Sequence, residues 1–307
     1  MEGSLGHIPV LKDTIVEVFQ SVSGCVLDAT FGGGGHTRAL LSTNPHISIV
    51  ALDADPEAIA RSKTVEKQFP GRFEFHSGNF AEASSLGKRW NAALMDLGVS
   101  SFQLDQAERG FSFRNEGPLD MRMNPEIGLS AREFLQTAHE EELVRAIRDF
   151  GEEPQWRNVV RAILTHRDRE DWVTTTDFVN FLMKNTTLYR SKKPGIHPAT
   201  RTFQGLRIYV NDELGCLEEG LRQIFDDLQA NGLLAVITFH SLEDRIVKQF
   251  FREKCGKSLN RDDAEPRQFK TIEAREYFRK PVVADDVEIQ QNPRARSAKL
   301  RIIQKLP

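Results

Sequence analysis

Four consecutive glycines stand between an apolar stretch and a histidine in DATFGGGGHT, residues 28–37. A glycine run after a strand lets the backbone approach a ligand closely, and a following helix presents free N–H groups and a positive dipole end. A nicotinamide dinucleotide loop would need a third glycine where Thr37 or Arg38 stands. The Gly-Lys-Ser/Thr of a nucleotide-binding P-loop is missing as well. The segment therefore predicts a loop for a different cofactor.

Acids accompany the glycines at two places. Asp28 precedes Gly32-x-Gly34 by four residues, which resembles motif I of S-adenosylmethionine-dependent methyltransferases. There the glycines pass under the cofactor and the acid lies near its methionine end. Asp53 ends a second apolar run, and we expect it to accept hydrogen bonds from both ribose hydroxyls. Phe80 follows a third run, where it would either stack on the adenine or be an ordinary core side chain.

Asp96 ends the fourth apolar run, where methyltransferases place residues that face the methyl group. An exocyclic amine of a base is a poor nucleophile because its lone pair is delocalised into the ring. Acceptors on its hydrogens favour the pyramidal form that attacks the sulfonium carbon in line. Enzymes of that type often carry Asn/Asp-Pro-Pro-Tyr/Phe, but Leu97-Gly98 follows Asp96 here. We expect Asp96 to contact the cofactor, and it is also the candidate catalytic residue.

These residues sit in a β-α alternation. Strand-length apolar runs at 25–30, 47–53, 72–78 and 92–98 alternate with helix-compatible segments at 37–43 and 55–69. The alternation resumes with a helix over 207–230, a strand over 233–241 and a helix over 242–252, and 280–286 with 299–305 would form a closing hairpin. This pattern predicts an α/β fold, a Rossmann-like parallel sheet covered by helices on both faces.

Helical patterns alone occupy residues from about 105 to 205, at 138–151, 158–167 and 175–184, the last with Thr175 or Thr176 as its cap. We therefore expect a small all-α domain over 108–205, inserted into a sheet domain made of 1–107 and 206–307.

Composition excludes several classes of protein. The 307 residues are 39% hydrophobic, and no apolar run approaches the ~20 residues of a membrane span. The start resembles neither a signal nor a transit peptide, so we expect a cytoplasmic protein. Cys25, Cys216 and Cys255 form no C-x-x-C pair and are expected to be reduced thiols. The eight histidines make no H-x-x-H pair, so no metal site is expected.

Basic residues are concentrated although the net charge is −3. Residues 189–211 and 290–307 contain no acid and carry Arg190, Lys192, Lys193, Arg201 and Arg207, and Arg294, Arg296, Lys299, Arg301 and Lys305. Each stretch is either a solvated surface or a local footprint for phosphates.

Several longer sequence segments occur here in the same order as in one known protein family. They are HIPVL (7–11), DATFGGGGHT (28–37), DLGVSS with QLD and AERGFSF (96–113), GPLDMRM (117–123), HPATRTFQ with LRI, VN and EL (197–214), FHSLEDRIVK (239–248) and NPRARSAKLR (292–301). With these blocks the sequence resembles the RsmH/MraW family of bacterial 16S ribosomal RNA (cytosine-N4)-methyltransferases over nearly its whole length. The resemblance implies methylation of N4 of a cytidine, cytosine 1402 of 16S rRNA, in the decoding centre of the small (30S) ribosomal subunit.

The resemblance also implies a set of site residues. The family's cofactor contacts fall on Gly34, Gly35, His36, Asp53, Phe80, Asp96 and Gln103. His36 and Gln103 come from the resemblance alone, and Phe102 stands where many relatives have proline before that glutamine.

The candidate RNA contacts are His197, Arg201, Arg207, His240, Arg294 and Arg296. In the segment 197–207 the arginines would bind phosphates and His197 would lie near the base; alternatively, the segment is a domain junction whose arginines pair with acids of the sheet domain. The residues after His240, Glu243 to Arg245, could pair within the first turn of a helix.

Three other functions stay open at this point. They are a non-catalytic assembly factor that keeps a cofactor site, an amino-methyltransferase acting on DNA or free nucleotides, and, weakest, a dehydrogenase. The sequence leaves the oligomeric state open between a monomer and a homodimer.

Overall fold

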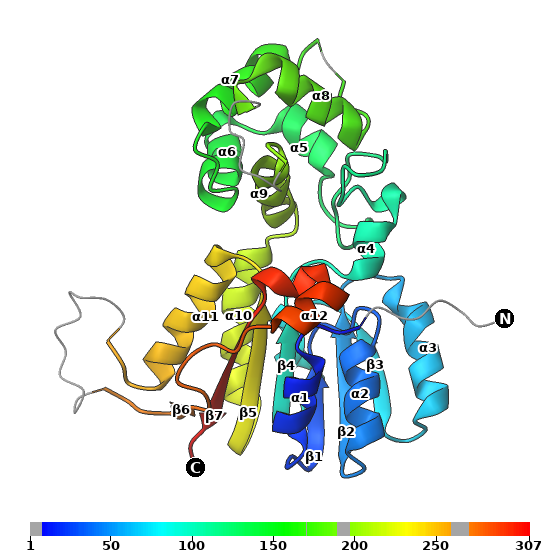
Figure 1. The fold of residues 1–307 in the computed structure, drawn as a ribbon, viewed down its shortest axis with the longest axis vertical. Helices are drawn as coiled ribbons and strands as arrows, with labels where there is room; N and C mark the ends of the chain where they lie inside the picture. Colours follow the sequence, from blue (N-terminus) through cyan, green and yellow to red (C-terminus); the bar gives the residue numbers. More distant parts are fainter. Residues whose placement is uncertain (1–7, 170, 189–196, 259–269) are drawn as a thin grey trace. The chain divides into compact units, whose positions relative to one another are not determined.

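The computed structural model describes residues 8–169, 171–188, 197–258 and 270–307. The chain divides into two compact units: a sheet unit, made of the chain up to Gly98 together with Leu214–Pro307, and a helical unit, Val99–Glu213 (Figure 1). The units meet at 98/99 and 213/214 and not at the expected 107/108 and 205/206. The two expected positions lie inside helices, at Ala107–Arg109 and Thr200–Val210. Arg190, Lys192 and Lys193 of the first basic stretch lie outside the described residues.

A seven-stranded sheet with the order β3-β2-β1-β4-β5-β7-β6 forms the centre of the sheet unit (Figure 1). Its strands are β1 (Gly24–Asp28), β2 (Ile47–Asp53), β3 (Phe73–Ser77), β4 (Trp90–Asp96), β5 (Leu228–Thr238), β6 (Ala274–Glu276) and β7 (Lys299–Lys305). The strands β1 to β5 are parallel, and β7 runs antiparallel between β5 and β6. The predicted α/β fold with a parallel sheet is confirmed.

The direction in which successive strands are added to the sheet reverses at β1. From β1 the chain continues outward through β2 to β3, then returns to place β4 on the other side of β1. Ligands of such sheets bind beyond the carboxyl ends of the strands at this switch point. Asp28 and Asp96 end the two strands that meet there.

Helices cover both faces of the sheet. They are α1 (Lys12–Phe19), α2 (Gly35–Thr43), α3 (Ala58–Gln68), η1 (Phe80–Leu86), α10 (Glu213–Asp227), α11 (Ser241–Lys254), α12 (Asp286–Gln291) and η6 (Pro293–Ser297). Alternate strand residues serve opposite faces: Val26 packs in the cluster that contains α1, α2 and α3, and Leu27 packs in the one that contains α10 and α11. This two-sided burial explains the nearly continuous apolar strands.

The helical unit has its own core. Its helices are α4 (Ser101–Asp105), η2 (Ala107–Arg109), α5 (Ala131–Thr137), α6 (Glu140–Val144), the π-turn η3 (Arg145–Phe150), α7 (Trp156–His166), α8 (Thr175–Asn185) and α9 (Thr200–Val210). Buried aromatic rings hold it together, with Trp172 centred 5.4 Å from Phe178 and 4.7 Å from Phe181. Among the described helices, none is both long and apolar enough to cross a membrane.

The helix predicted over 207–230 is wrong as a single element. Its residues form the end of α9, the whole of α10 and, from Leu228, the start of β5. The two helices are separated at Asn211 and Asp212, where Asp212 has φ of 45°. The carboxamide of Asn211 accepts a hydrogen bond from the Met123 N–H at 2.7 Å and donates to the Met121 carbonyl at 2.8 Å. Because these partners are 88 and 90 residues away, a helical pattern could not reveal the break.

Other differences are smaller. The strand predicted to begin at 233 begins at Leu228. The cap of α8 is Thr174, whose hydroxyl accepts the Asp177 N–H at 3.1 Å, not Thr175 or Thr176. The predicted hairpin between 280–286 and 299–305 is reduced to one bridge, Val282 with Leu300, because β5 and β6 occupy the two edges of β7.

Close packing of α9 on η3 gives a testable prediction. An added Cβ on Gly205 would lie 2.9 Å from Gly151 Cα and still closer to the Ala146 carbonyl oxygen, both of them backbone atoms. Gly205→Ala should therefore lower the free energy of unfolding by about 2–3 kcal/mol, measured by urea denaturation. Gly78→Ala, whose added Cβ has no neighbour nearer than 3.9 Å, is the control. Equal stability of the two variants would contradict the packing described here.

Candidate functional site

The glycine loop connects β1 to α2 and needs glycine for reasons within the protein. Gly32 and Gly34 have φ of 53° and 72°, in the left-handed region that side chains disfavour. An added Cβ on Gly34 would lie 2.7 Å from the Phe31 ring, and one on Gly35 would lie 2.5 Å from Pro9 Cγ. Phe31 and Pro9 thus close in behind the loop, and bare backbone lines it.

Charged side chains hold this backbone in place. The Gly32 N–H donates to Asp53 Oδ2 at 2.6 Å, and the Gly32 carbonyl accepts from Arg61 Nε at 3.0 Å. The next carbonyl, of Gly33, accepts from Arg38 at 2.6 Å. Two successive carbonyl oxygens are therefore bound to guanidinium groups.

The first turn of α2 begins at Gly35 and ends the loop. Its N-cap residue is Gly34, which has no side chain to bond the first N–H groups. The N–H groups of a helix's first turn carry a partial positive charge and bind anions such as carboxylates. The loop thus presents helix N–H groups at the carboxyl end of β1.

Asp53 is held at the end of β2. One oxygen accepts the Gly32 N–H, and Oδ1 accepts the Asp55 N–H at 2.8 Å. Burial raises the pKa of Asp53 to about 6, against the opposing effect of these hydrogen bonds and of Arg61. Each carboxylate oxygen has a second lone pair, so the ionised group can also accept two ribose hydroxyls.

Asp28 organises the ends of β1 and β4. It accepts the Thr37 hydroxyl at 2.5 Å and the Thr30 N–H at 3.2 Å, and the Thr30 hydroxyl accepts the Asp96 N–H at 2.6 Å. The side chain is almost fully buried, and burial raises its pKa in spite of the hydrogen bond from Thr37. Asp28 therefore ties the first turn of α2 to the strand ends.

His36 and Asp96 face each other beside this network. His36 Nε2 lies 3.5 Å from Asp96 Oδ2, and the two side chains are 7% and 24% exposed. Within the described part of the chain, neither ring nitrogen of His36 nor Asp96 Oδ1 has a hydrogen-bond partner. Buried polar atoms without partners are rare, so the three atoms indicate a site for a polar ligand group.

Phe80 lies at the start of η1, after β3. Its ring packs against α10, where an added Cβ on Gly220 would lie 2.5 Å from it, and it stays half-buried. Asn79 fixes the turn by accepting the Ala81 N–H at 2.9 Å and donating to Cys216 Sγ at 3.2 Å. Contact of this ring with adenine stays a prediction.

Six of the seven expected cofactor residues gather at the carboxyl ends of the strands β1 to β4: Gly34, Gly35, His36, Asp53, Phe80 and Asp96. The seventh, Gln103, belongs to α4 of the helical unit. The carboxamide oxygen of Gln103 accepts the Ser100 N–H at 2.9 Å, and the backbone N–H of Gln103 donates to the Ser100 hydroxyl at 3.2 Å. This capping box positions Gln103 in the turn that begins α4.

The expected RNA residues of the helical unit differ in what they contact. His197 is exposed, with its ring centred 4.9 Å from that of Phe113. Arg201 donates to the Glu152 carbonyl at 3.2 Å. Arg207 binds both oxygens of Glu213 at 2.7 and 2.8 Å. Arg207 therefore pairs with an acid, but Glu213 belongs to the helical unit and not to the sheet unit as the alternative expected.

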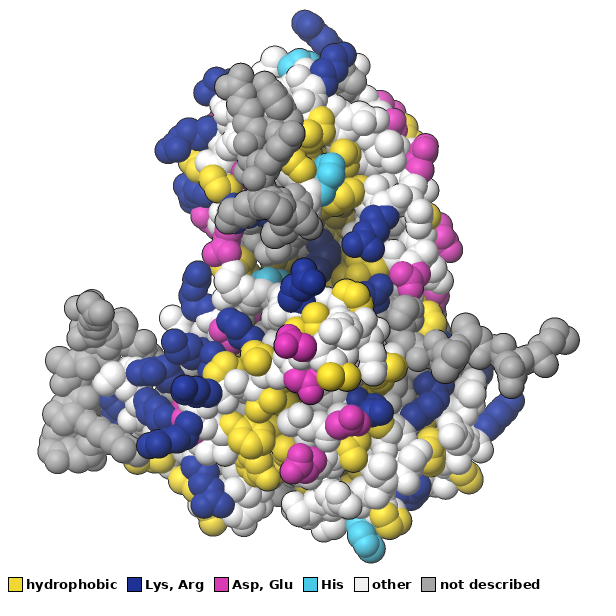
Figure 2. All heavy atoms as spheres, viewed as in Figure 1, with side chains coloured by type: hydrophobic (Ala, Val, Ile, Leu, Met, Phe, Trp, Pro, Cys, Tyr) yellow, Lys and Arg dark blue, Asp and Glu magenta, His cyan; other side chains and the backbone are white. Residues whose placement is uncertain are grey.

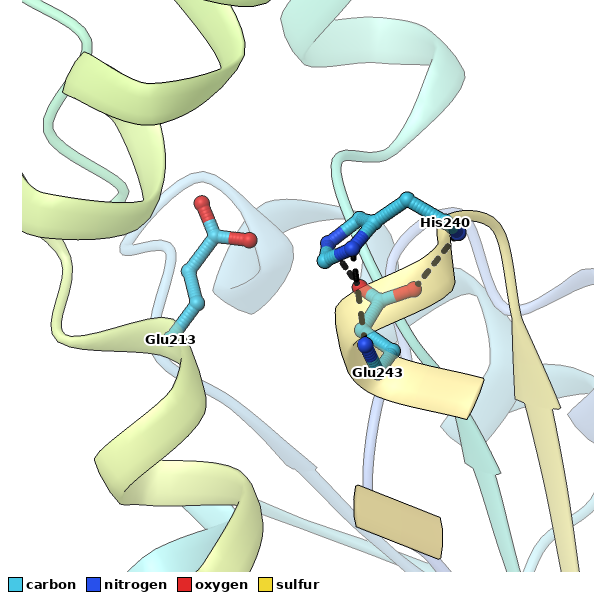
Figure 3. Close-up of side chains that lie close together, drawn as sticks. All are labelled: Glu213, His240 and Glu243. Atoms are coloured by element: carbon cyan, nitrogen blue, oxygen red, sulfur yellow. Dashed lines mark hydrogen bonds and ion pairs between the residues drawn. The ribbon is translucent and has the colours of Figure 1, made fainter. Parts of the chain in front are cut away.

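The expected RNA residues of the sheet unit are His240, Arg294 and Arg296. His240 is the N-cap of α11, as Figure 3 shows: Glu243 Oε2 accepts the His240 N–H at 3.2 Å, and His240 Nε2 lies 3.1 Å from Glu243 Oε1. Arg294 is half-buried and Arg296 exposed in η6.

Arg61 and Thr30 were missed from the sequence. Thr37 and Arg38 were noticed there only because they exclude a dinucleotide loop. A lone arginine in α3, 29 residues after the carbonyl it binds, belongs to no recognised pattern. Its position in the first half of the helix that follows Asp53 is the one signal that could have suggested it.

Asp53 gives a prediction about pH. Because its pKa is raised to about 6, the acceptor form is lost as pH falls through about 6, and affinity for S-adenosylhomocysteine should fall about tenfold per unit below it. Titration calorimetry from about pH 8 to pH 5 measures this effect. In Asp53→Asn the pH dependence should vanish with a loss of affinity of about 10- to 100-fold, whereas exposed Asp13→Asn should behave as wild type. An affinity of the wild type that is flat across this range would refute the assignment.

Arg61 gives a second prediction. Removing its bond to the Gly32 carbonyl in Arg61→Gln should raise the Kd for S-adenosylmethionine about tenfold and leave kcat at saturating cofactor nearly unchanged. Arg61→Lys, which keeps a cation near buried Asp55, should recover part of the affinity. Lys67→Gln, on the exposed side of α3, is the matched control. An unchanged Kd in Arg61→Gln would show that the loop does not depend on this arginine.

Comparison with known proteins identifies the family. The family model described as the MraW methylase family matches residues 4–306. Similar solved structures include a rRNA methylase from Streptococcus thermophilus, 10% identical over 96% of this chain and 94% of that one, with a TM-score of 0.40. Another is the N-methyltransferase NodS from Bradyrhizobium japonicum with S-adenosylhomocysteine, 8% identical over 96% and 85%, with a TM-score of 0.42. The chain therefore belongs to the MraW methylase family, and S-adenosylmethionine is its methyl donor.

Proposed function

We propose that the protein methylates N4 of a cytidine of 16S ribosomal RNA, cytosine 1402 by its family resemblance, in the small ribosomal subunit of the cytoplasm. The observation that carries this proposal is Asp96, a half-buried carboxylate at the end of β4 with one oxygen that has no partner within the described residues. Family membership supports methyl transfer, and this acceptor supports an amine as the group that is methylated.

The residues of the sheet unit fit the cofactor. When bound, S-adenosylmethionine supplies an electrophilic methyl group on a sulfonium. The first-turn N–H groups of α2 suit its carboxylate, and the partnerless atoms of His36 suit its polar amino-acid end. Asp53 accepts the ribose hydroxyls, and Phe80 offers an apolar face to the adenine.

Asp96 then acts on the cytosine amine. Its side chain is 24% exposed, and we propose that its carboxylate accepts a hydrogen bond from the N4 amino group. That bond withdraws the amine hydrogen from the ring plane and favours the pyramidal nitrogen whose lone pair can attack. The amine proton becomes acidic only as the new C–N bond forms, so a strong base is unnecessary.

Part of the expected RNA set is suited to phosphates. Arg201 and Arg296 are not bound to carboxylates in any described contact, and His197 is exposed. Arg207 is bound to Glu213, and His240 Nδ1 accepts the Glu243 N–H at 3.4 Å, so we assign both residues to the structure of their own units. Of the six expected residues, we therefore propose that His197, Arg201 and Arg296 reach RNA and that Arg207 and His240 shape the protein, and we assign no role to Arg294.

The product decides between this proposal and its alternatives. Purified protein, labelled S-adenosylmethionine and small subunits lacking the modification should yield N4-methylcytidine at one position, identified by mass spectrometry of the digested RNA. Single-stranded DNA and free nucleosides should stay unlabelled. Asp96→Asn should lower kcat about 10²- to 10³-fold, while Asp105→Asn, in α4 of the helical unit, should not.

Other outcomes contradict the proposal in distinct ways. Label in DNA or nucleosides but not in subunits would favour the amino-methyltransferase that acts on DNA. A different methylated nucleoside would discard the cytosine N4 assignment. Cofactor binding without transfer to subunits would favour the assembly factor.

A further inference from the structure

The outward face of α11 carries only polar side chains. At 100° per residue, Ser241, Arg245, Lys248, Gln249 and Arg252 lie on one side of the helix. The opposite side, with Ile246, Val247 and Phe250, packs in the core of the sheet unit. Arg245 and Lys248 are exposed and Arg252 is half-buried. We call Arg245, Lys248 and Arg252 the basic face of α11.

Two of the acids on the same helix, Glu243 and Asp244, are bound to other parts of the sheet unit. Glu243 is buried, and its carboxylate accepts the Phe239 N–H at 2.7 Å. Asp244 is bound by two cations of β7, Arg301 at 2.8 Å and Lys299 at 3.1 Å. Together these three side chains carry a net charge of about +1. Glu253 lies on the flank, 100° beyond Arg252. In the part of the chain shown in Figure 2, Lys and Arg side chains gather over α11.

The basic face of α11 lies near the sheet edge at which β1 and β4 end with Asp28 and Asp96. Asp96 pairs with Ile237 of β5, and α11 begins four residues after Ile237 at Ser241. The N-terminus of α11 therefore lies at the same edge as the glycine loop, because β1, β4 and β5 are parallel. From Arg245 to Arg252 the face extends about 10 Å away from this edge.

We propose that the basic face of α11 binds the phosphate backbone of the substrate RNA next to the target nucleotide. Three cations at i, i+3 and i+7 present a row of donors to a polyanion. Arg252 is held in place by the Ser258 carbonyl, to which Nε donates at 2.7 Å. The inference rests on the proposed function, since it assumes an RNA substrate, and it adds a contact surface outside the cofactor site.

The salt dependence of binding tests this assignment. In the variant R245Q/K248Q/R252Q, the slope of log affinity for small subunits lacking the modification against log salt should shrink by about 2–3. Between 50 and 200 mM salt the wild type should lose about 20- to 40-fold more affinity than the variant. Kd for S-adenosylmethionine and kcat at saturating subunits should be unchanged.

Two controls make the result specific. K63Q/K67Q/R89Q removes three exposed charges from α3 and from the amino-terminal end of β4 and should keep the wild-type slope. R245K/R252K keeps the charges and should keep the slope as well. A slope in the triple α11 variant equal to that of the wild type overturns the inference, as does an equal decrease in the control variant.

The two proposals fail separately. If wild-type protein binds subunits but forms no N4-methylcytidine, the proposed function fails, and the slopes still decide whether α11 contacts RNA. If the wild type methylates subunits and the triple variant binds and methylates them with the same salt dependence, the inference about α11 fails alone.

Discussion

The bonds that Asp53 and Arg61 make to Gly32 set the geometry on which the site depends. One residue of the loop is held at its N–H by a carboxylate and at its carbonyl by a guanidinium. Four glycines in a row are costly to order because glycine loses more conformational freedom on folding than any other residue. These charge-assisted bonds offset that cost and turn the loop toward a ligand. Since we propose that the same carboxylate binds the ribose, loop order and cofactor binding would share one group.

Much of the sheet unit could be predicted because buried parallel strands are apolar on both faces. The runs ending at Asp53 and Asp96 correspond to β2 and β4, and the acids stand at the strand ends where the pattern indicated them. The break at Asn211 could not be predicted, because its carboxamide holds Met121 and Met123 from far away in the sequence. Local patterns record local constraints, and here a long-range contact decided where α9 ends.

The candidate site also contains residues that could be predicted from the sequence and residues that could not. Glycines and strand-end acids have fixed positions relative to their strands, so the sequence could place Gly34, Asp53 and Asp96 at the carboxyl ends of the strands. Arg61 could not, because its partner is a backbone carbonyl, which any residue type supplies. RNA recognition was the least accessible part: Arg207 matches a phosphate contact by its type alone, yet it is bonded to Glu213. Charge runs alone do not distinguish an arginine that binds phosphate from one that binds a neighbouring acid.

We propose that the glycine loop, with Asp53 and Asp96, is the cofactor and methyl-transfer site. A crystal structure of the protein with S-adenosylhomocysteine tests it most directly. We expect the ribose hydroxyls within hydrogen-bonding distance of Asp53, the ligand's carboxylate at the first turn of α2, and its sulfur facing Asp96. A ligand bound elsewhere, or a ribose that makes no contact with Asp53, would contradict it.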